Sequence, residues 1–291
     1  MKKIQHVELG GTLFVSATHK DLATIVSGEK YPTLKSVVVD SEDSISEKEL
    51  QKAIESIKEM LNSFTKGTIL VFLRPRNIRV LEQFLSFENI DTIDGFVLPK
   101  FSLTNADEYL ELLTDTPHLI MPSIEEKELF EQDKLIQLKE KLLSHKHKIL
   151  LIRFGLEDML RQLKMKRRCE DSIFDLSATN AILGNFIAIF KSAGFEISGG
   201  VYPCFKDICG FTKDVQRDLR EGLFSKTIIH PSQIDIINEL YKVEKVEFEE
   251  ALEICKSDEA IFSQNSKMAE KLTMTPYSQH IINRAEVYGL K

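Results

Sequence analysis

The stretch SVVVDSEDSISEKELQKAIESIKEMLNSF, residues 36–64, contains the repeating unit from which the fold can be predicted. It opens with a continuous apolar, β-branched run, which is typical of a strand buried on both faces of a parallel sheet. The rest has helical spacing, with Ser46 and Glu49 at capping-box distance. Its apolar residues fall on one stripe: Leu50, Ile54, Ile57 and Leu61. The stretch is therefore predicted to be one buried strand followed by one amphipathic helix.

This strand-then-helix pattern recurs along most of the chain. Eight short apolar runs precede helical segments, at 11–17, 36–43, 67–75, 94–100, 118–125, 148–155, 195–202 and 226–232. Eight repeats predict an α/β protein with a (β/α)8 TIM barrel over residues 1–241. Residues 242–291 are predicted to be a C-terminal helical appendage that packs on the barrel or on a neighbouring subunit. The alternative, a doubly wound open sheet, wants a glycine-rich turn after the first strand, and SATHKD at 16–21 contains none.

Composition limits the possible partners. The 291 residues carry a formal net charge of -7, which argues against nucleic acid as the main partner. One dense basic patch, at 164–168, is either a solvated surface or a site that captures an anionic substrate. No apolar stretch has the length of a membrane span, and the N-terminal residues lack a signal-peptide pattern. A cytoplasmic protein that does not bind membranes is expected.

The four cysteines show no metal-binding pattern. No pair has CxxC spacing, and we expect all of them to be reduced thiols: Cys169, Cys204, Cys209 and Cys255.

Charged and polar residues follow nearly every predicted strand. In chain order they are Asp40, Glu42, Asp43, Arg74, Arg76, Lys100, Glu125, Asp158, Tyr202 and His230. The carboxyl ends of barrel strands surround one mouth, where the active sites of such barrels form. This clustering indicates an enzyme.

Glu125 and Asp158 end neighbouring strands, and two carboxylates with waters and substrate oxygens are what Mg²⁺ accepts. The alternative for Asp158 is to stabilise the start of the following helix. Arg74, with Arg76 as its competitor, has a guanidinium that fits a substrate carboxylate, unless it forms an ion pair across the rim.

Asp40 and Asp43 are candidates for orienting metal-bound waters, for pairing with Arg74, or for general acid and base catalysis. For His230, which precedes Pro231, capping of a helix is favoured over catalysis.

Five motifs match one known family in order: VVVDSEDSIS (37–46), DGFVLPK (94–100), MPSIEEKEL (121–129), FGLEDMLRQL (154–163) and TIIHPSQIDIIN (227–238). With them the chain resembles, over nearly its whole length, the HpcH/HpaI aldolase and citrate lyase beta-subunit (CitE-like) superfamily. It looks most like the divergent branch of C–C bond lyases associated with tellurium-resistance and stress-response gene clusters.

The resemblance implies a Mg²⁺-dependent C–C bond lyase, with Mn²⁺ as an alternative ion, that acts on a keto acid, a β-hydroxy acid or its CoA thioester. It implies a homo-oligomer, a trimer or a hexamer. Glu125 and Asp158 match the metal ligands, Arg74 matches the arginine that grips a carboxylate, and Asp40 and Asp43 match supporting acids. The residues expected to contact substrate are Phe14, Arg74, Arg76, Gly155 and Tyr202.

Two departures from the family pattern keep other functions open. Ser16, Ala17 and Thr18 replace a Pro-Gly turn, and Pro203 and Cys204 interrupt the segment after Tyr202. The alternatives are a barrel that binds a small acid without turnover, and a metal-dependent thioester hydrolase.

Overall fold

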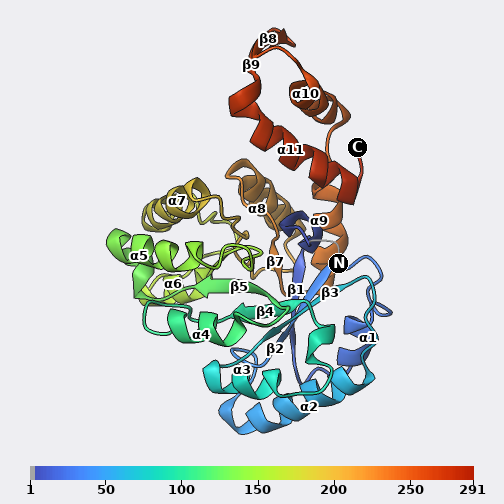
Figure 1. The fold of residues 1–291 in the computed structure, drawn as a ribbon, viewed down its shortest axis with the longest axis vertical. Helices are drawn as coiled ribbons and strands as arrows, with labels where there is room; N and C mark the ends of the chain where they lie inside the picture. The colour runs from blue at the N-terminus through green and yellow to red at the C-terminus, as the bar shows by residue number, and fades with distance from the viewer. Residues whose placement is uncertain (1–3) are drawn as a thin grey trace. The chain divides into compact units, whose positions relative to one another are not determined.

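A computed structural model describes residues 4–291, and its largest element is a parallel sheet of seven strands (Figure 1). The sheet order is β6-β5-β4-β3-β2-β1-β7. The strands are β1 (Thr12–Ser16), β2 (Ser36–Asp40), β3 (Leu70–Arg74), β4 (Gly95–Leu98), β5 (Leu119–Ile124), β6 (Arg153–Phe154) and β7 (Thr227–Ile228). Each lies inside one of the predicted apolar runs.

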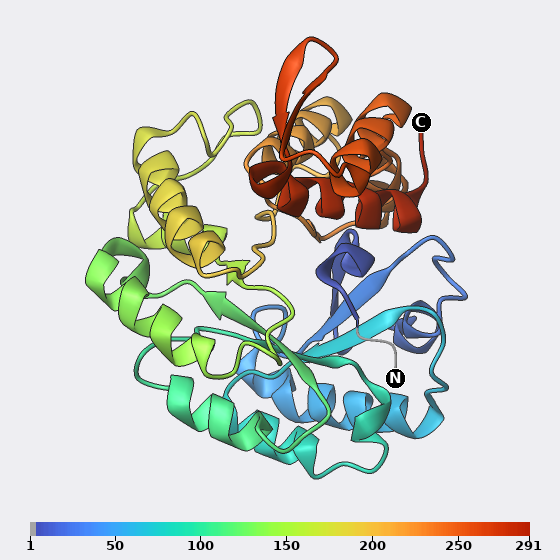
Figure 2. The same ribbon diagram turned by 45° about the horizontal axis from the view of Figure 1, so that its top comes forward.

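The remaining predicted run, at 195–202, joins the two edges of this sheet. Parallel bridges link Ile152 to Ile197 and Gly199 to Lys226. The backbone N–H of Ser198 donates to the carbonyl of Ile152 at 3.0 Å, and that of Phe224 donates to the carbonyl of Ile197 at 3.0 Å. The sheet is strongly curled, as Figure 2 shows. The predicted TIM barrel is confirmed, with its least regular wall at residues 195–199.

Helices cover the outside of the curled sheet (Figure 1). They are α1 (Leu22–Val26), α2 (Leu50–Ser63), α3 (Ile78–Leu85), α4 (Ala106–Leu113), α5 (Gln132–Leu143), α6 (Leu156–Gln162), α7 (Ser177–Ser192) and α8 (Ile208–Arg220). In α2 the predicted stripe is buried at Ile54, Ile57 and Leu61. At its start a 3-10 turn, Glu47–Glu49, precedes the helix, and Ser46 Oγ donates to Glu49 Oε2 at 2.6 Å.

Inward-facing side chains fill one end of the barrel. Their buried cluster comprises Leu9, Val38, Phe72, Val97, Met121, Leu150 and Leu151. Because side chains alternate along a strand, residues two positions beyond this layer also face inward. Asp40 and Arg74 are such residues, and the apolar layer thus forms a floor beneath the polar carboxyl ends of the strands.

A buried cluster of four charges holds α8 against the wall next to β7. Lys226, only 1% exposed, contacts the carboxylates of Asp214 and Asp218, and Asp214 also pairs with Arg167. Gly199 leaves room for this cluster, because a Cβ there would overlap the carboxylate of Asp218. Arg167 belongs to the basic patch at 164–168. Because it is buried in an ion pair with Asp214, it is neither a solvated surface residue nor a site that captures an anionic substrate.

The expectation of four reduced cysteines is wrong for one pair. Cys169 and Cys204 form a disulfide, whereas Cys209 and Cys255 are free thiols. The paired residues are 35 positions apart, and the fold brings their Cα atoms to 5.8 Å. Spacing along the chain could not reveal this approach.

Residues 235–291 form a second compact unit. Beyond α9 (Ile234–Leu240), it contains α10 (Lys245–Lys256), β8 (Ile261–Gln264), β9 (Lys267–Glu270) and α11 (Lys271–Tyr288). Helices α10 and α11 share a core of Val243, Ala251, Ile281 and Ala285. The predicted helices are present, but β8 and β9 add an antiparallel hairpin whose turn uses positive φ at Asn265 and Ser266. The packing partner of this unit stays a prediction, as does the trimer or hexamer.

Within residues 4–291, no helix is both long and apolar enough to span a membrane.

We predict that Lys226→Met lowers the free energy of unfolding by about 3–5 kcal/mol, because two buried carboxylates lose their shared cation. Urea denaturation followed by circular dichroism measures the change. Lys213→Met, on the exposed face of α8, is the control and should shift stability by less than about 0.5 kcal/mol. Equal effects of the two substitutions would show that the buried cluster does not stabilise the barrel.

Candidate active site

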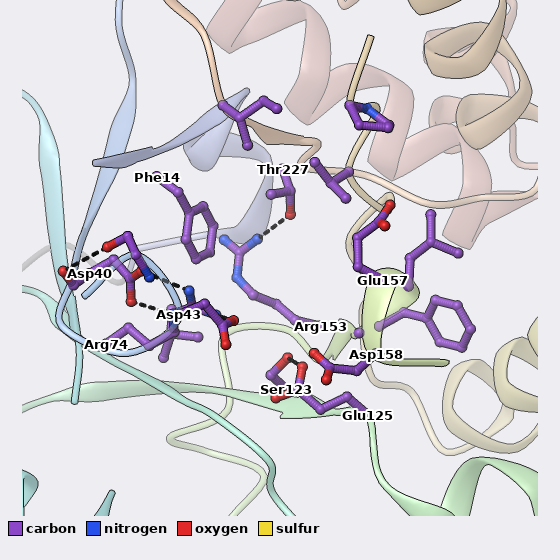
Figure 3. Close-up of a pocket in the computed structure, with 18 of the residues that line it drawn as sticks. Phe14, Asp40, Asp43, Arg74, Ser123, Glu125, Arg153, Glu157, Asp158 and Thr227 are labelled. Carbon is purple, nitrogen blue, oxygen red and sulfur yellow. Dashed lines mark hydrogen bonds and ion pairs between the residues drawn. The ribbon is translucent and has the colours of Figure 1, made fainter. Parts of the chain in front are cut away.

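A cavity of about 500 Å³ opens at the carboxyl ends of the strands (Figure 3). Seven of the residues predicted from sequence line it: Phe14, Asp40, Asp43, Arg74, Glu125, Gly155 and Asp158. They come from five different wall elements of the barrel. The mouth predicted from strand ends therefore exists as one cavity.

Arg74 and Asp40 are directly opposite each other on β3 and β2. Arg74 Nε donates to Asp40 Oδ1 at 2.6 Å and Nη2 donates to Oδ2 at 2.8 Å, which makes the pair bidentate. Arg74 Nη1 also donates to Asp43 Oδ2 at 3.0 Å. Burial opposes ionisation of Asp40, but the bonds from Arg74 outweigh it and hold the pKa of Asp40 below its ordinary value. Each nitrogen of Arg74 already binds a carboxylate of the protein.

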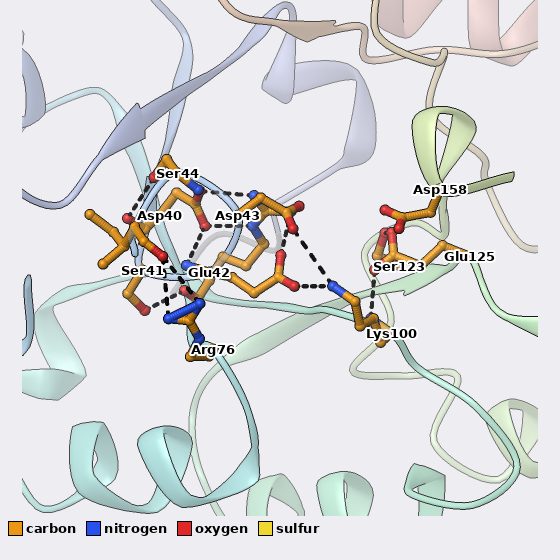
Figure 4. A network of polar contacts seen from close by, with 12 residues as sticks. Asp40, Ser41, Glu42, Asp43, Ser44, Arg76, Lys100, Ser123, Glu125 and Asp158 are labelled. Atoms are coloured by element: carbon orange, nitrogen blue, oxygen red, sulfur yellow. Dashed lines mark hydrogen bonds and ion pairs between the residues drawn. The ribbon is translucent and has the colours of Figure 1, made fainter. Parts of the chain in front are cut away.

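Glu42 and Lys100 extend this network (Figure 4). Lys100 Nζ binds Glu42 Oε1 and lies 3.6 Å from Asp43 Oδ1. Three carboxylates thus share two cations. Burial raises the pKa of the Glu42 carboxyl to about 7, and the positive charge of Arg74 opposes this shift only in part.

Glu125 follows β5 and is held in place by two hydrogen bonds. The backbone N–H of Lys100 donates to its Oε1 at 2.7 Å, and Ser123 Oγ donates to its Oε2 at 2.9 Å. Burial raises the pKa of Glu125, and the nearby charge of Asp158 acts in the same direction. Gly155 lies against this side chain, and a Cβ there would overlap Glu125. Gly155 is needed because it gives Glu125 room beside the end of β6.

Asp158 lies in the first turn of α6, with its carboxylate turned toward Glu125 (Figure 3). It accepts a 2.7 Å hydrogen bond from Arg161 Nη2. No cluster of three or more candidate metal-ligating side chains occurs among the described residues. A Mg²⁺ site needs only one or two carboxylates, because waters and substrate oxygens complete its shell. Each oxygen of Glu125 keeps a lone pair beyond the hydrogen bond it accepts, so the two carboxylates fit a divalent ion.

Five of the strand-end residues named from the sequence do not line this cavity: Glu42, Arg76, Lys100, Tyr202 and His230. Arg76 donates to the carbonyl of Ile45 at 3.1 and 3.2 Å. Tyr202 is buried, and its hydroxyl lies 2.8 Å from Asp207 Oδ2. The geometry gives no support to a substrate contact by either residue. His230 caps the following turn, because its Nδ1 accepts from the backbone N–H of Ser232 at 3.2 Å, as favoured from sequence.

Other residues that line the cavity were not among the predicted metal-binding, catalytic or substrate-contacting residues: Ser16, Ser123, Arg153, Glu157 and Thr227. Arg153 carried a usable signal, since it is a charged residue inside an otherwise apolar strand run, LLIRFG (150–155). Thr227 and Ser123 carried none, because small hydroxyl residues are common on any strand.

Comparison with known proteins assigns the family. The model of the C–C bond lyases of the TIM-barrel fold matches residues 3–290. The chain belongs to this family. The resemblance to HpcH/HpaI aldolases and citrate lyase beta subunits is thereby confirmed.

Individual relatives of this family member are distant. It is 26% identical over 151 residues to citrate lyase subunit beta of Escherichia coli K12, a match that covers 50% of this chain and 48% of the relative. It is 23% identical over 217 residues to a (3S)-malyl-CoA thioesterase of Cereibacter sphaeroides, covering 73% and 71%. The chain spans about half the length of the citrate lyase relatives it matches.

Solved structures that share the fold include the following two. The protein CitE of Mycobacterium tuberculosis, in complex with magnesium, acetoacetate and coenzyme A, has a TM-score of 0.69 at 17% identity, over 97% of this chain and 99% of that one. RipC of Yersinia pestis has a TM-score of 0.62 at 18% identity, over 84% and 99%.

We predict that Gly155→Ala displaces Glu125 and lowers the free energy of unfolding by about 1–3 kcal/mol, because the added methyl overlaps a held side chain. Gly184→Ala is the matched control: nothing surrounds its Cβ position in α7, and helix propensity should raise stability by about 0.5–1 kcal/mol. Urea denaturation of both variants measures the difference. Equal stability of the two would contradict the close approach.

We predict a pH-dependent effect of Glu42→Gln. Between the ordinary pKa of 4.5 and a pKa of about 7, the folded protein keeps a proton on Glu42 that the unfolded chain has lost. The free energy of unfolding therefore falls as pH rises through this window, and the substitution removes that fall. Relative to the parent, the variant should gain roughly 1–3 kcal/mol from about pH 5 to about pH 8, as measured by urea denaturation. The surface variant Glu47→Gln should show no such gain, and a parallel course of all three proteins would disprove the shift.

Proposed function

We propose that this protein is a Mg²⁺-dependent lyase that cleaves, or in reverse forms, a carbon–carbon bond in a carboxylated β-hydroxy acid or its CoA thioester. One observation carries the proposal: in a chain of a C–C bond lyase family, the carboxylates of Glu125 and Asp158 converge on one cavity. The magnesium and small-acid complexes of CitE, at 17% identity, support the choice of ion and ligand class.

A bound Mg²⁺ supplies positive charge that offsets the negative charge developing on the substrate oxygen during cleavage. Glu125 and Asp158 would hold the ion. Ser123 and the backbone of Lys100 keep Glu125 in a single orientation, so its position needs no rearrangement when substrate binds.

The acids of β2 are the groups placed to move protons. Cleavage requires that the β-hydroxyl loses a proton as the C–C bond breaks, and that the resulting enolate gains one. Asp43 lines the cavity with its side chain 55% exposed, whereas Glu42 lies buried behind it. The pKa of Glu42, raised to about 7, leaves this carboxyl about half protonated next to Asp43 at neutral pH. Asp43 would accept the hydroxyl proton, and the pair would return one proton to the enolate.

Arg74 of β3 and Asp40 of β2 would contribute by keeping other groups of the cavity in place. Arg74 holds Asp40 and Asp43 at fixed places on the cavity wall. This role differs from the direct grip on a substrate carboxylate that the family resemblance implies for Arg74.

Thioester hydrolysis is the second candidate, because the (3S)-malyl-CoA thioesterases are among the relatives. The same cavity would then direct water at a thioester carbonyl. Incorporation of labelled oxygen from water into a free acid, without a keto compound among the products, distinguishes hydrolysis from C–C cleavage.

We predict that Glu125→Gln and Asp158→Asn each lower C–C lyase activity about 100-fold or more and weaken Mg²⁺ binding. The assay is a panel of β-hydroxy acids and their CoA thioesters with Mg²⁺, in which keto products are identified by mass spectrometry. Chelation should abolish activity, and added Mg²⁺ should restore it. Calorimetric titration with Mg²⁺ measures the affinity.

Glu140→Gln, on the exposed face of α5, is the control and should leave activity and Mg²⁺ affinity unchanged. If both site variants bind Mg²⁺ as tightly as the parent, the metal assignment is wrong. Tight binding of a small acid without any product would instead indicate a binding protein.

A further inference from the structure

Arg153 is a buried arginine at the centre of the cavity. It begins β6, in register with Ser123 of β5, and both side chains line the cavity. Strand alternation places it one layer above Leu151 of the apolar floor. The residue is 3% exposed. Figure 3 shows its guanidinium extending toward Thr227, away from Glu125 and Asp158.

The contacts of Arg153 leave its charge without an anionic partner. Its Nη1 donates to Thr227 Oγ1 at 3.2 Å, and its Nη2 lies 3.5 Å from the sulfur of Met121. Its Nε is buried without a hydrogen-bond partner. Within residues 4–291, no carboxylate lies within ion-pair distance of it, whereas Arg74 pairs with three.

The surroundings of Arg153 add positive charge instead of removing it. Both Arg74 and Arg153 lie over the ring of Phe14, at 5.2 and 5.3 Å from its centroid. Burial, together with the charge of Arg74, lowers the pKa of Arg153 to about 9. The guanidinium is still protonated at neutral pH. An unpaired buried cation is unfavourable in a folded protein unless a ligand supplies the opposite charge.

We propose that Arg153, together with Thr227, binds a carboxylate of the substrate on the side of the cavity away from Glu125 and Asp158. The inference rests on the proposed function and narrows its substrate. The molecule should carry a carboxylate in addition to the oxygens that face the two acidic residues. Arg153 has free donors in a planar fork that matches a carboxylate, whereas each nitrogen of Arg74 already donates to Asp40 or Asp43. Arg74 is then a positioning residue, and Arg153 is the anion-binding residue.

The test measures anion binding to the full chain in the presence of a chelator, so that neither metal nor turnover enters. Malonate is titrated calorimetrically at constant ionic strength, and thermal unfolding is followed in parallel. The parent should bind malonate and gain thermal stability from it. Arg153→Met should weaken this binding about 10-fold or more. Without malonate, it should unfold at a higher temperature than the parent, because an unpaired buried charge has been removed.

Two further variants make the result specific. Arg79→Met, which removes an exposed arginine of α3, should bind malonate as the parent does. Arg153→Lys, which keeps the charge but loses the fork, should bind with intermediate affinity and covers the case in which the methionine variant does not fold. Inorganic phosphate, a tetrahedral anion, should bind more weakly than malonate.

Unchanged malonate binding by Arg153→Met, no binding by the parent, or preference for phosphate would each overturn the inference. Failure of the lyase assay alone would not, because malonate binding is measured without catalysis. If malonate binding depends on Arg153 and every lyase substrate fails, the carboxylate site stands and the proposed reaction falls.

Discussion

The ion pair between Arg74 and Asp40 determines what the rest of the cavity can do. Their bidentate contact follows from register, because the two residues are opposite each other on adjacent parallel strands and face the same way. In this pair, the positive charge of Arg74 is neutralised by a carboxylate of the protein itself. Among the described residues, the pair thereby leaves Arg153 as the cavity-lining arginine without a carboxylate partner. Beside this pair, burial and, to a smaller extent, the neighbouring Asp43 raise the pKa of Glu42 to about 7.

The cavity consequently has two chemically different sides. Around Glu125 and Asp158, oxygen atoms converge that suit a hard divalent cation. Around Arg153 and Thr227, donors converge that suit an anion. A ligand that carries negative charge at one end and chelating oxygens at the other satisfies both sides at once. The two sides together support a small acid as ligand more strongly than either side alone. The acidic side disfavours anions and the arginine side disfavours cations, so that a ligand must present the right group to each.

Close approach of backbone segments makes this arrangement possible. Gly155 and Gly199 occupy positions where a Cβ would overlap the carboxylates of Glu125 and Asp218. The first lets β6 end beside a metal-binding candidate, and the second lets α8 place its acids against Lys226. Both glycines lie in the part of the wall with the shortest strands, where buried ion pairs accompany the few strand contacts.

The architecture of the barrel and much of the cavity lining could be predicted from the amino-acid sequence. Repetition of apolar runs and amphipathic helices is a local signal, and the end of each run marks the strand terminus at which side chains meet. For that reason Asp40, Arg74, Glu125 and Asp158 could be predicted to share one mouth. Which charges neutralise one another, in contrast, could not be predicted before the folded chain was known. The saturation of Arg74, the isolation of Arg153 and the disulfide between Cys169 and Cys204 depend on distances between segments far apart in the chain. Such distances leave no periodic trace in the sequence, because they arise from the closure of the barrel as a whole.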